Sequence, residues 1–326
     1  MSDAKFDLTA LGELLIDFTD SGVSTRGNPV MEANPGGAPC NVLSELCRLG
    51  HSTAFIGKVG ADMFGRQLRE AIESVGISSE GLIEDGSVNT TLAFVHTLPD
   101  GDRDFSFYRR PGADMMLRPD EVKNALIDAC RIFHFGTLSM TSESCREATV
   151  SALKLAKACG KRISFDPNIR EPLWDDLRDL RKCMEFGMGF CDILKISDNE
   201  IRWFTGEDDC KKAALMLKER YGIPLILVSL GAEGSMALSD SAFAFCPAFK
   251  VDTTETTGAG DCFCACVLSY VLEHGFASYG EAELFSMLRF ANAAAAIVTT
   301  RRGALAVMPD RNETEALINA SEGRSQ

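Results

Sequence analysis

The feature that most constrains the fold of this chain is the alternation of strand-like and helical segments along its second half. Short apolar runs typical of buried strands are separated by segments whose apolar residues follow the helical period. The expected strands span residues 131–135, 162–165, 192–196 and 225–230, and the expected helices span residues 119–129, 142–158, 199–204 and 208–220. Strands connected through helices form a parallel sheet with helices packed on its faces. The sequence therefore predicts the α/β class.

The first half of the chain combines further buried strands with polar excursions. Residues 6–16 predict one apolar central strand that ends at Asp17, and residues 52–59 predict another. Residues 18–35 are polar and rich in turn residues, and the strand-like runs at 90–96 and 102–108 flank Leu98-Pro99-Asp100-Gly101, a hairpin sequence. We expect these excursions to form a small sheet over the main one. A chain of 326 residues is long enough for one large domain with such an appendage.

Polar residues recur at the ends of the expected strands. They occupy residues 166–170, 195–200 and 229–231. Ligands of open α/β sheets gather outside the carboxyl ends of the strands. A polar tip on several successive strands therefore predicts a shared cleft.

A second constraint is Gly258-Ala259-Gly260-Asp261, which precedes a long apolar run without Gly or Pro until Gly275. A buried helix is expected to begin near Ala259, so backbone N–H groups at its positive end can close around an anion. A carboxylate at Asp261 would repel that anion, unless it takes a proton from a hydroxyl while the amides hold a phosphoryl group. The alternative is a structural helix start in which Asp261 caps free N–H groups.

Charge and composition exclude several classes of partner. The net charge of -14 argues against a nucleic acid or an anionic membrane surface. No run of about 18 apolar residues predicts a membrane span. The twelve cysteines are scattered without a C-x-x-C pair, and no secretory leader is recognised, so we expect reduced thiols in a cytoplasmic protein. Cys262 and Cys266 would share a helix face, where core packing is favoured over metal binding.

Other catalytic classes lack their motifs. The four histidines have no metal-ligand spacing, and neither a G-x-S-x-G nor a G-x-G-x-x-G sequence occurs at the required position. Residues 60–67 have the glycine spacing of a P-loop, but Arg66-Gln67 replaces the Lys and Ser/Thr that contact phosphate and metal.

Two longer sequences carry a resemblance to a known family. Residues 36–41 (GGAPCN) with residues 57–65 (GKVGADMFG) resemble the first signature of the ribokinase-like (PfkB) carbohydrate kinases, and residues 256–261 (TTGAGD) resemble the second. Residues 107–114 and 166–174 are most similar to those of the fructokinases within this family. The resemblance implies a three-layer α/β/α core with a small β-sheet lid. It also implies a single domain over residues 1–326, with the lid at about residues 18–35 and 88–113.

The resemblance also implies roles for individual residues. Asp261 is similar to the general base, and Gly258, Ala259 and Gly260 to the anion hole. The residues that resemble sugar contacts, or residues that position them, are Asp17, Gly37, Asn41, Arg109 and Arg170. Those that resemble nucleotide contacts are Asn168, Ser229, Gly231, Gly234 and Asn292. Glu200 resembles the acid that organises Mg²⁺ through water.

Two positions depart from the family pattern. Ser197 stands where the family often has Asn on the nucleotide side. Glu255 stands where the second signature usually begins with Asp, at a position that builds a monovalent-cation (K⁺) site in many relatives.

The expected activity is transfer of the γ-phosphoryl group of ATP to a sugar hydroxyl, with fructose as the leading substrate. The alternatives are 2-keto-3-deoxygluconate, ribose or a nucleoside as substrate, and, from another class, a catalytically idle sugar sensor. Phe94, Phe105 and Phe107 would lie on the two-sided lid sheet, so we expect a homodimer through the lid.

Overall fold

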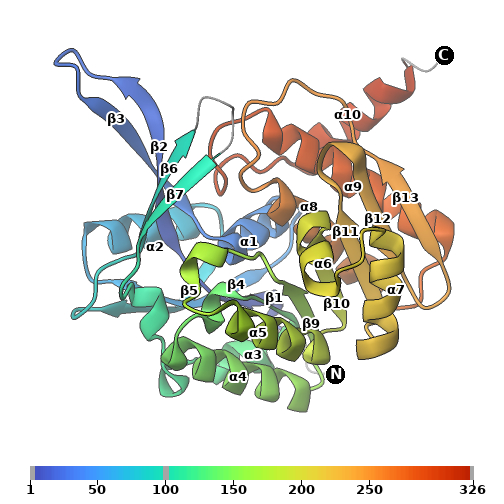
Figure 1. Ribbon diagram of the computed structural model, residues 1–326, viewed down its shortest axis with the longest axis horizontal. Helices are drawn as coiled ribbons and strands as arrows, with labels where there is room; N and C mark the ends of the chain where they lie inside the picture. Colours follow the sequence, from blue (N-terminus) through green and yellow to red (C-terminus); the bar gives the residue numbers. More distant parts are fainter. Residues whose placement is uncertain (1–3, 98–102, 324–326) are drawn as a thin grey trace.

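A mixed sheet forms the centre of the molecule (Figure 1). The computed structural model describes residues 4–97 and 103–323. Within these ranges the main sheet has nine strands in the order β13-β12-β11-β10-β9-β8-β1-β4-β5. The bounds of these strands are β1 Phe6–Leu11, β4 Thr53–Gly60, β5 Ser78–Asp85, β8 Cys130–Gly136, β9 Arg162–Asp166, β10 Ile193–Ser197, β11 Leu225–Ser229, β12 Gly234–Leu238 and β13 Phe243–Pro247. All neighbours pair in parallel from β5 to β11, and β12 and β13 pair antiparallel at one edge.

Helices cover both faces of this sheet, because its strands are apolar on both sides. In β11, Leu225 and Leu227 join one core cluster, whereas Ile226 and Val228 join the other. The helices of the first cluster are α1 Ala38–Arg48, α2 Met63–Ser74, α8 Ala259–His274 and α9 Glu281–Thr299. Those of the second are α3 Asn124–Asp128, α4 Glu143–Ala158, α5 Leu177–Phe190, α6 Asp198–Thr205 and α7 Cys210–Tyr221, and α10 Arg311–Gly323 packs on α9. The predicted three-layer α/β/α core is therefore confirmed.

A second sheet extends from the main body (Figure 1). Its strands, in the order β3-β2-β6-β7, are β3 Pro29–Gly36, β2 Leu15–Val23, β6 Leu92–Thr97 and β7 Arg103–Tyr108. Phe18 stacks on Phe94 with ring centroids 4.8 Å apart, and its edge contacts Phe64 of α2. The face of the second sheet that carries Phe18 and Phe94 therefore packs against α2 of the main body. The hairpin sequence at residues 98–101 lies outside the described residues.

The N-terminal strand prediction was wrong in one respect. Residues 6–16 do not form one strand, since β1 ends at Leu11 in the main sheet and β2 begins at Leu15 in the second sheet. Gly12 lies at this break, where a side chain would approach the ring of Pro39 to 2.5 Å, so only glycine fits there. Asp17 therefore lies within a strand of the second sheet and not at the tip of a core strand.

One other prediction needed correction, and one pair of strands was missed. Residues 119–129 form two short pieces, a 3₁₀ turn at Pro119–Glu121 and α3, because Val122 has an extended backbone between them. The antiparallel pair β12 and β13 was not predicted.

One helix in the described ranges, α9, is long and apolar enough by composition to cross a membrane. Half of it is buried inside the protein, as is usual for a core helix, and it packs against α8 and β13. Its composition is therefore only weak grounds for a membrane span.

Candidate active site

The helix start at Gly258 forms one wall of a cavity at the carboxyl ends of the strands. Gly258 is the N-cap of α8 with φ of 79°, a conformation that strains any side-chain-bearing residue. The first-turn amides of α8 have no acceptor within the helix and carry its positive partial charge. A side chain at Gly260 would come within 3.1 Å of Lys195 Nζ. Because Gly260 has no side chain, the backbone at the start of α8 and the ammonium group of Lys195 both line the cavity.

Asp261 lies in the first turn of α8 and is held by Asn41 of α1. Asn41 Nδ2 donates to Asp261 Oδ2 at 2.8 Å. Burial raises the pKa of Asp261 above its ordinary value, although the Asn41 hydrogen bond and the Lys195 charge lower it. Asn41 Oδ1 is buried and has no hydrogen-bond partner among the described residues. A ligand hydroxyl could donate to that oxygen while facing Asp261.

A cavity of about 270 Å³ joins these groups to the second sheet. This volume is close to the lower end of the range for small-molecule sites, about 300–1,000 Å³. The predicted site residues that line it are Asp17, Gly37, Asn41, Asn168, Arg170, Glu255, Gly258, Gly260 and Asp261. Asp17 of β2 is half-buried, and Phe107 of β7 also lines the cavity, so the second sheet forms part of its wall.

A second cavity adjoins the first and shares Asn168, Arg170 and Lys195 with it. It also contains Ser197 and Glu200 at the start of α6. Glu200 accepts hydrogen bonds from the backbone of Ile169 at 2.7 Å and of Ser197 at 2.8 Å. This acid therefore ties the loop after β9 to the loop after β10.

Lys195 of β10 lines both cavities and lies beside Asp166, the last residue of β9. Lys195 Nζ lies 2.9 Å from Asp166 Oδ2, and both side chains are buried. Asp166 Oδ2 thus forms a buried ion pair with Lys195, whereas Oδ1 has no partner among the described residues. Burial raises the pKa of Asp166 to about 7, opposed by the Lys195 charge. Lys195 stood in a predicted polar tip without an assigned role, and its spacing gave no further signal.

Glu13 is a second functional candidate that the sequence did not indicate. It is buried at the wall of the first cavity, and its Oε1 accepts from the N–H of Ala38 at the start of α1 at 3.0 Å. Burial raises the pKa of Glu13 to about 7. An acidic residue between two strands has no local pattern that would identify it.

Several predicted contacts lie outside both cavities. Arg109 is buried, donating to Asp114 at 2.8 Å and to the carbonyl of Leu138 at 3.0 Å, so its guanidinium joins the base of the second sheet to the body. Asn292 of α9 is also buried, and its amide bonds Ser235 and the carbonyl of Cys246. Neither residue lines either cavity, and their predicted contacts stay predictions.

The remaining predicted residues differ in their distance from the cavities. Ser229 ends β11 beside Ser197 of β10, next to the second cavity. Gly231 and Gly234 flank the exposed turn before β12. Ala259 begins α8 between two residues that line the first cavity.

The fold and this site together define a class. A helix start with Gly258 and Gly260, a buried carboxylate beside it and a buried lysine are groups suited to phosphoryl transfer to a hydroxyl. The family model of the pfkB family carbohydrate kinases matches residues 5–311. The chain belongs to this family, which confirms the prediction made from the two signatures.

Individual relatives agree with the family assignment. The chain is 38% identical over 316 residues to a probable fructokinase-4 of Arabidopsis thaliana, covering 96% of this chain and 97% of that one. It is similar in structure to a fructokinase from Xylella fastidiosa with bound ATP, with a TM-score of 0.88, 30% identity and coverage of 97% and 99%. A fructokinase variant from Vibrio cholerae O395 with fructose, ADP and potassium ion bound has a TM-score of 0.84, 25% identity and the same coverage.

Proposed function

We propose that this protein is an ATP-dependent fructokinase that converts D-fructose to fructose 6-phosphate. The observation that carries the proposal is the convergence of Asp261, its partner Asn41 and the start of α8 in one cavity. Similarity to fructokinases over nearly the whole chain favours fructose among the sugars.

The sugar side of the site is proposed to lie between β2 and α1. Asp17 and Asn41 line the first cavity and offer acceptors for sugar hydroxyls. Gly37 lines it too, and its positive φ and contact with the Glu13 backbone leave no room for a side chain there. The hydroxyl that is phosphorylated would lie against Asp261. Asp261 takes its proton as the oxygen attacks the γ-phosphorus of ATP and ADP leaves.

The phosphoryl side is proposed to consist of amides and cations. The first turn of α8, from Gly258 to Gly260, would hold the transferred group, and Lys195 and Arg170 line the same space. Lys195 pairs with Asp166 at 2.9 Å, and since an ammonium group has three N–H donors, others can bind phosphate oxygens. A fixed cation at the developing charge lowers the barrier without reorganisation.

A divalent cation fits the acidic residues at this junction. Asp166 Oδ1 is buried without a partner, and Glu200 lines the second cavity; carboxylate oxygens of this kind are ligands that Mg²⁺ prefers. Such an ion, when bound, supplies charge neutralisation of the nucleotide phosphates. We propose that these residues hold it, with Glu200 acting through water.

The nucleotide is proposed to occupy the second cavity. Asn168 and Ser197 line it, and Ser229 lies beside it. Contacts from Gly231, Gly234 and Asn292 remain predictions, as does a direct sugar contact by Arg109. For a monovalent cation, Glu255 is the proposed acid; it lines the first cavity and accepts from the N–H of Gly303 at 3.3 Å.

The second sheet is proposed to act as a lid and as a dimer interface. Val23, Met31 and Tyr108 are apolar residues exposed on its strands, with exposed fractions of 72%, 37% and 67%. A second copy of the chain would cover them.

All twelve cysteines are free thiols, which supports the expectation of a reducing, cytoplasmic location.

A substrate panel tests the proposal. Purified protein would be assayed with ATP and fructose, 2-keto-3-deoxygluconate, ribose or a nucleoside, and the phosphorylated product identified by mass spectrometry. We expect the highest kcat/KM with fructose. A higher value for another sugar would leave only the kinase class, and sugar binding without phosphorylation of any substrate would indicate the sensor.

A further inference from the structure

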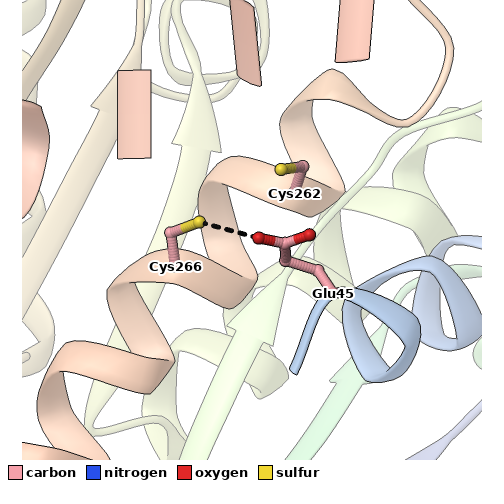
Figure 2. A group of neighbouring side chains, drawn as sticks. All are labelled: Glu45, Cys262 and Cys266. Atoms are coloured by element: carbon pink, nitrogen blue, oxygen red, sulfur yellow. Dashed lines mark hydrogen bonds between the residues drawn. The ribbon is translucent and has the colours of Figure 1, made fainter. Parts of the chain in front are cut away.

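Three potential metal ligands converge between α1 and α8, outside both cavities (Figure 2). Glu45 comes from α1, and Cys262 and Cys266 come from successive turns of α8. One carboxylate oxygen and both sulfurs lie within 4.8 Å of one another. The three residues are buried, with exposed fractions of 0%, 0% and 2%. The sequence alone favoured core packing for the two cysteines because it did not reveal that a carboxylate lies against them.

The carboxylate of Glu45 is only half satisfied by these neighbours. Cys266 Sγ donates to Oε1 at 3.3 Å, whereas Oε2 is buried and has no hydrogen-bond partner among the described residues. A buried acceptor without a partner costs about 1–3 kcal/mol. A cation between the two helices would satisfy this buried carboxylate.

We propose that Glu45, Cys262 and Cys266 bind one thiophilic divalent cation of the Zn²⁺ or Cd²⁺ type. Sulfur ligands select such ions over Mg²⁺ or Ca²⁺. Zn–S bonds of about 2.3 Å and Zn–O bonds of about 2.1 Å at tetrahedral angles require S···O separations of about 3.6 Å. The Glu45 Oε1 to Cys266 Sγ distance of 3.3 Å is already close to that value.

The location of the site links it to the helices that carry the catalytic groups. Asn41 lies one turn before Glu45 on α1, and Asp261 immediately precedes Cys262 on α8. The bound cation would therefore join the two helices behind the hydrogen bond from Asn41 to Asp261. The inference does not depend on which substrate the enzyme phosphorylates.

Spectroscopic titration of the intact protein tests the site. Protein treated with chelator and kept reduced by a phosphine would be titrated with Cd²⁺ and, separately, Co²⁺, with Zn²⁺ as competitor. We expect one equivalent to bind with a thiolate-to-metal charge-transfer band. Glu45→Gln and Cys266→Ser should each weaken binding by more than about tenfold, since even residues behind a ligand cost about 10–100-fold.

Cys264→Ser is the matched control, because Cys264 is equally buried on the same helix but lies outside the cluster. It should retain wild-type binding. Absence of the thiolate band in wild type, or an unchanged band in a Cys262→Ser/Cys266→Ser variant, would overturn the proposal. If the serine variants do not fold, Glu45→Gln, which keeps the shape of the side chain, tests the site by itself. A Glu45→Gln variant with wild-type affinity for Cd²⁺ would then refute the site.

Discussion

Replacing Lys195 by Met removes the buried cation at the junction of the two cavities and retains much of the side chain's apolar volume. If Lys195 stabilises the transferred phosphoryl group, its loss resembles removal of one fixed oxyanion donor, which lowers kcat by about 10²–10³-fold, or about 2.7–4 kcal/mol. Asp166 would also lose its neighbour at 2.9 Å. Breaking a buried ion pair costs about 3–5 kcal/mol of stability, so activity must be measured well below the midpoint of unfolding.

A second buried lysine provides the control for that loss of stability. Lys58 of β4 is 1% exposed and bonds Asp85 and Glu121 away from both cavities. Lys58→Met should lower the unfolding temperature but leave the kcat of the folded enzyme within a few-fold of wild type. Both variants would be assayed at saturating ATP and sugar, with folding checked by circular dichroism. A folded Lys195→Met enzyme with near wild-type kcat would refute the assigned role.

Three further predictions concern the lid, the core and the assembly. Arg109→Ala should raise KM for sugar far more than KM for ATP in steady-state kinetics, because Arg109 fixes the base of the lid through Asp114 and Leu138; equal effects on both would contradict this. Burial and the Lys195 charge lower the pKa of His134 from 6.5 to about 3. Between these two pH values the unfolded chain binds more protons than the folded one, so the free energy of unfolding decreases as the pH falls from 6.5 towards 3. His134→Gln should reduce this loss of stability by at most about 1.4 kcal/mol per pH unit. Melting temperatures of wild type and His134→Gln that depend equally on pH would contradict this role of His134. Light scattering at micromolar protein should give the mass of a dimer, and a monomeric mass would contradict the lid interface.

The parts of the fold that could be predicted from sequence are those determined locally. The start of α8 at Ala259 was predicted because an apolar run without Gly or Pro follows Gly258-Ala259-Gly260-Asp261, and the structure gives Gly258 a left-handed conformation at the N-cap. The parallel sheet was predicted because the strands from β8 to β11 alternate with helices. Both signals lie within short windows of the chain.

The parts that were missed depend on contacts between distant segments. The neighbourhood of Asp166 and Lys195 exists only because β9 pairs with β10, which no spacing within either strand reveals. Glu45 and Cys266 are 221 residues apart and meet through helix packing. The break between β1 and β2 likewise appears only in the sheet pairing, since the two strands join different sheets. Buried polar groups are thus the least predictable features, since their partners decide their role.

The central claim is that Asp261 takes the proton from the attacking sugar hydroxyl, and Asp261→Asn tests it most directly. The amide has nearly the same shape and can still pair with Asn41, so sugar and ATP binding should change little. Loss of a general base typically lowers the rate by about 10²–10⁴-fold. We predict that rapid-quench measurement of a single turnover will show phosphoryl transfer slowed by at least about 10²-fold, with dissociation constants for both substrates within a few-fold of wild type. Phosphoryl transfer within a few-fold of the wild-type rate would contradict the account.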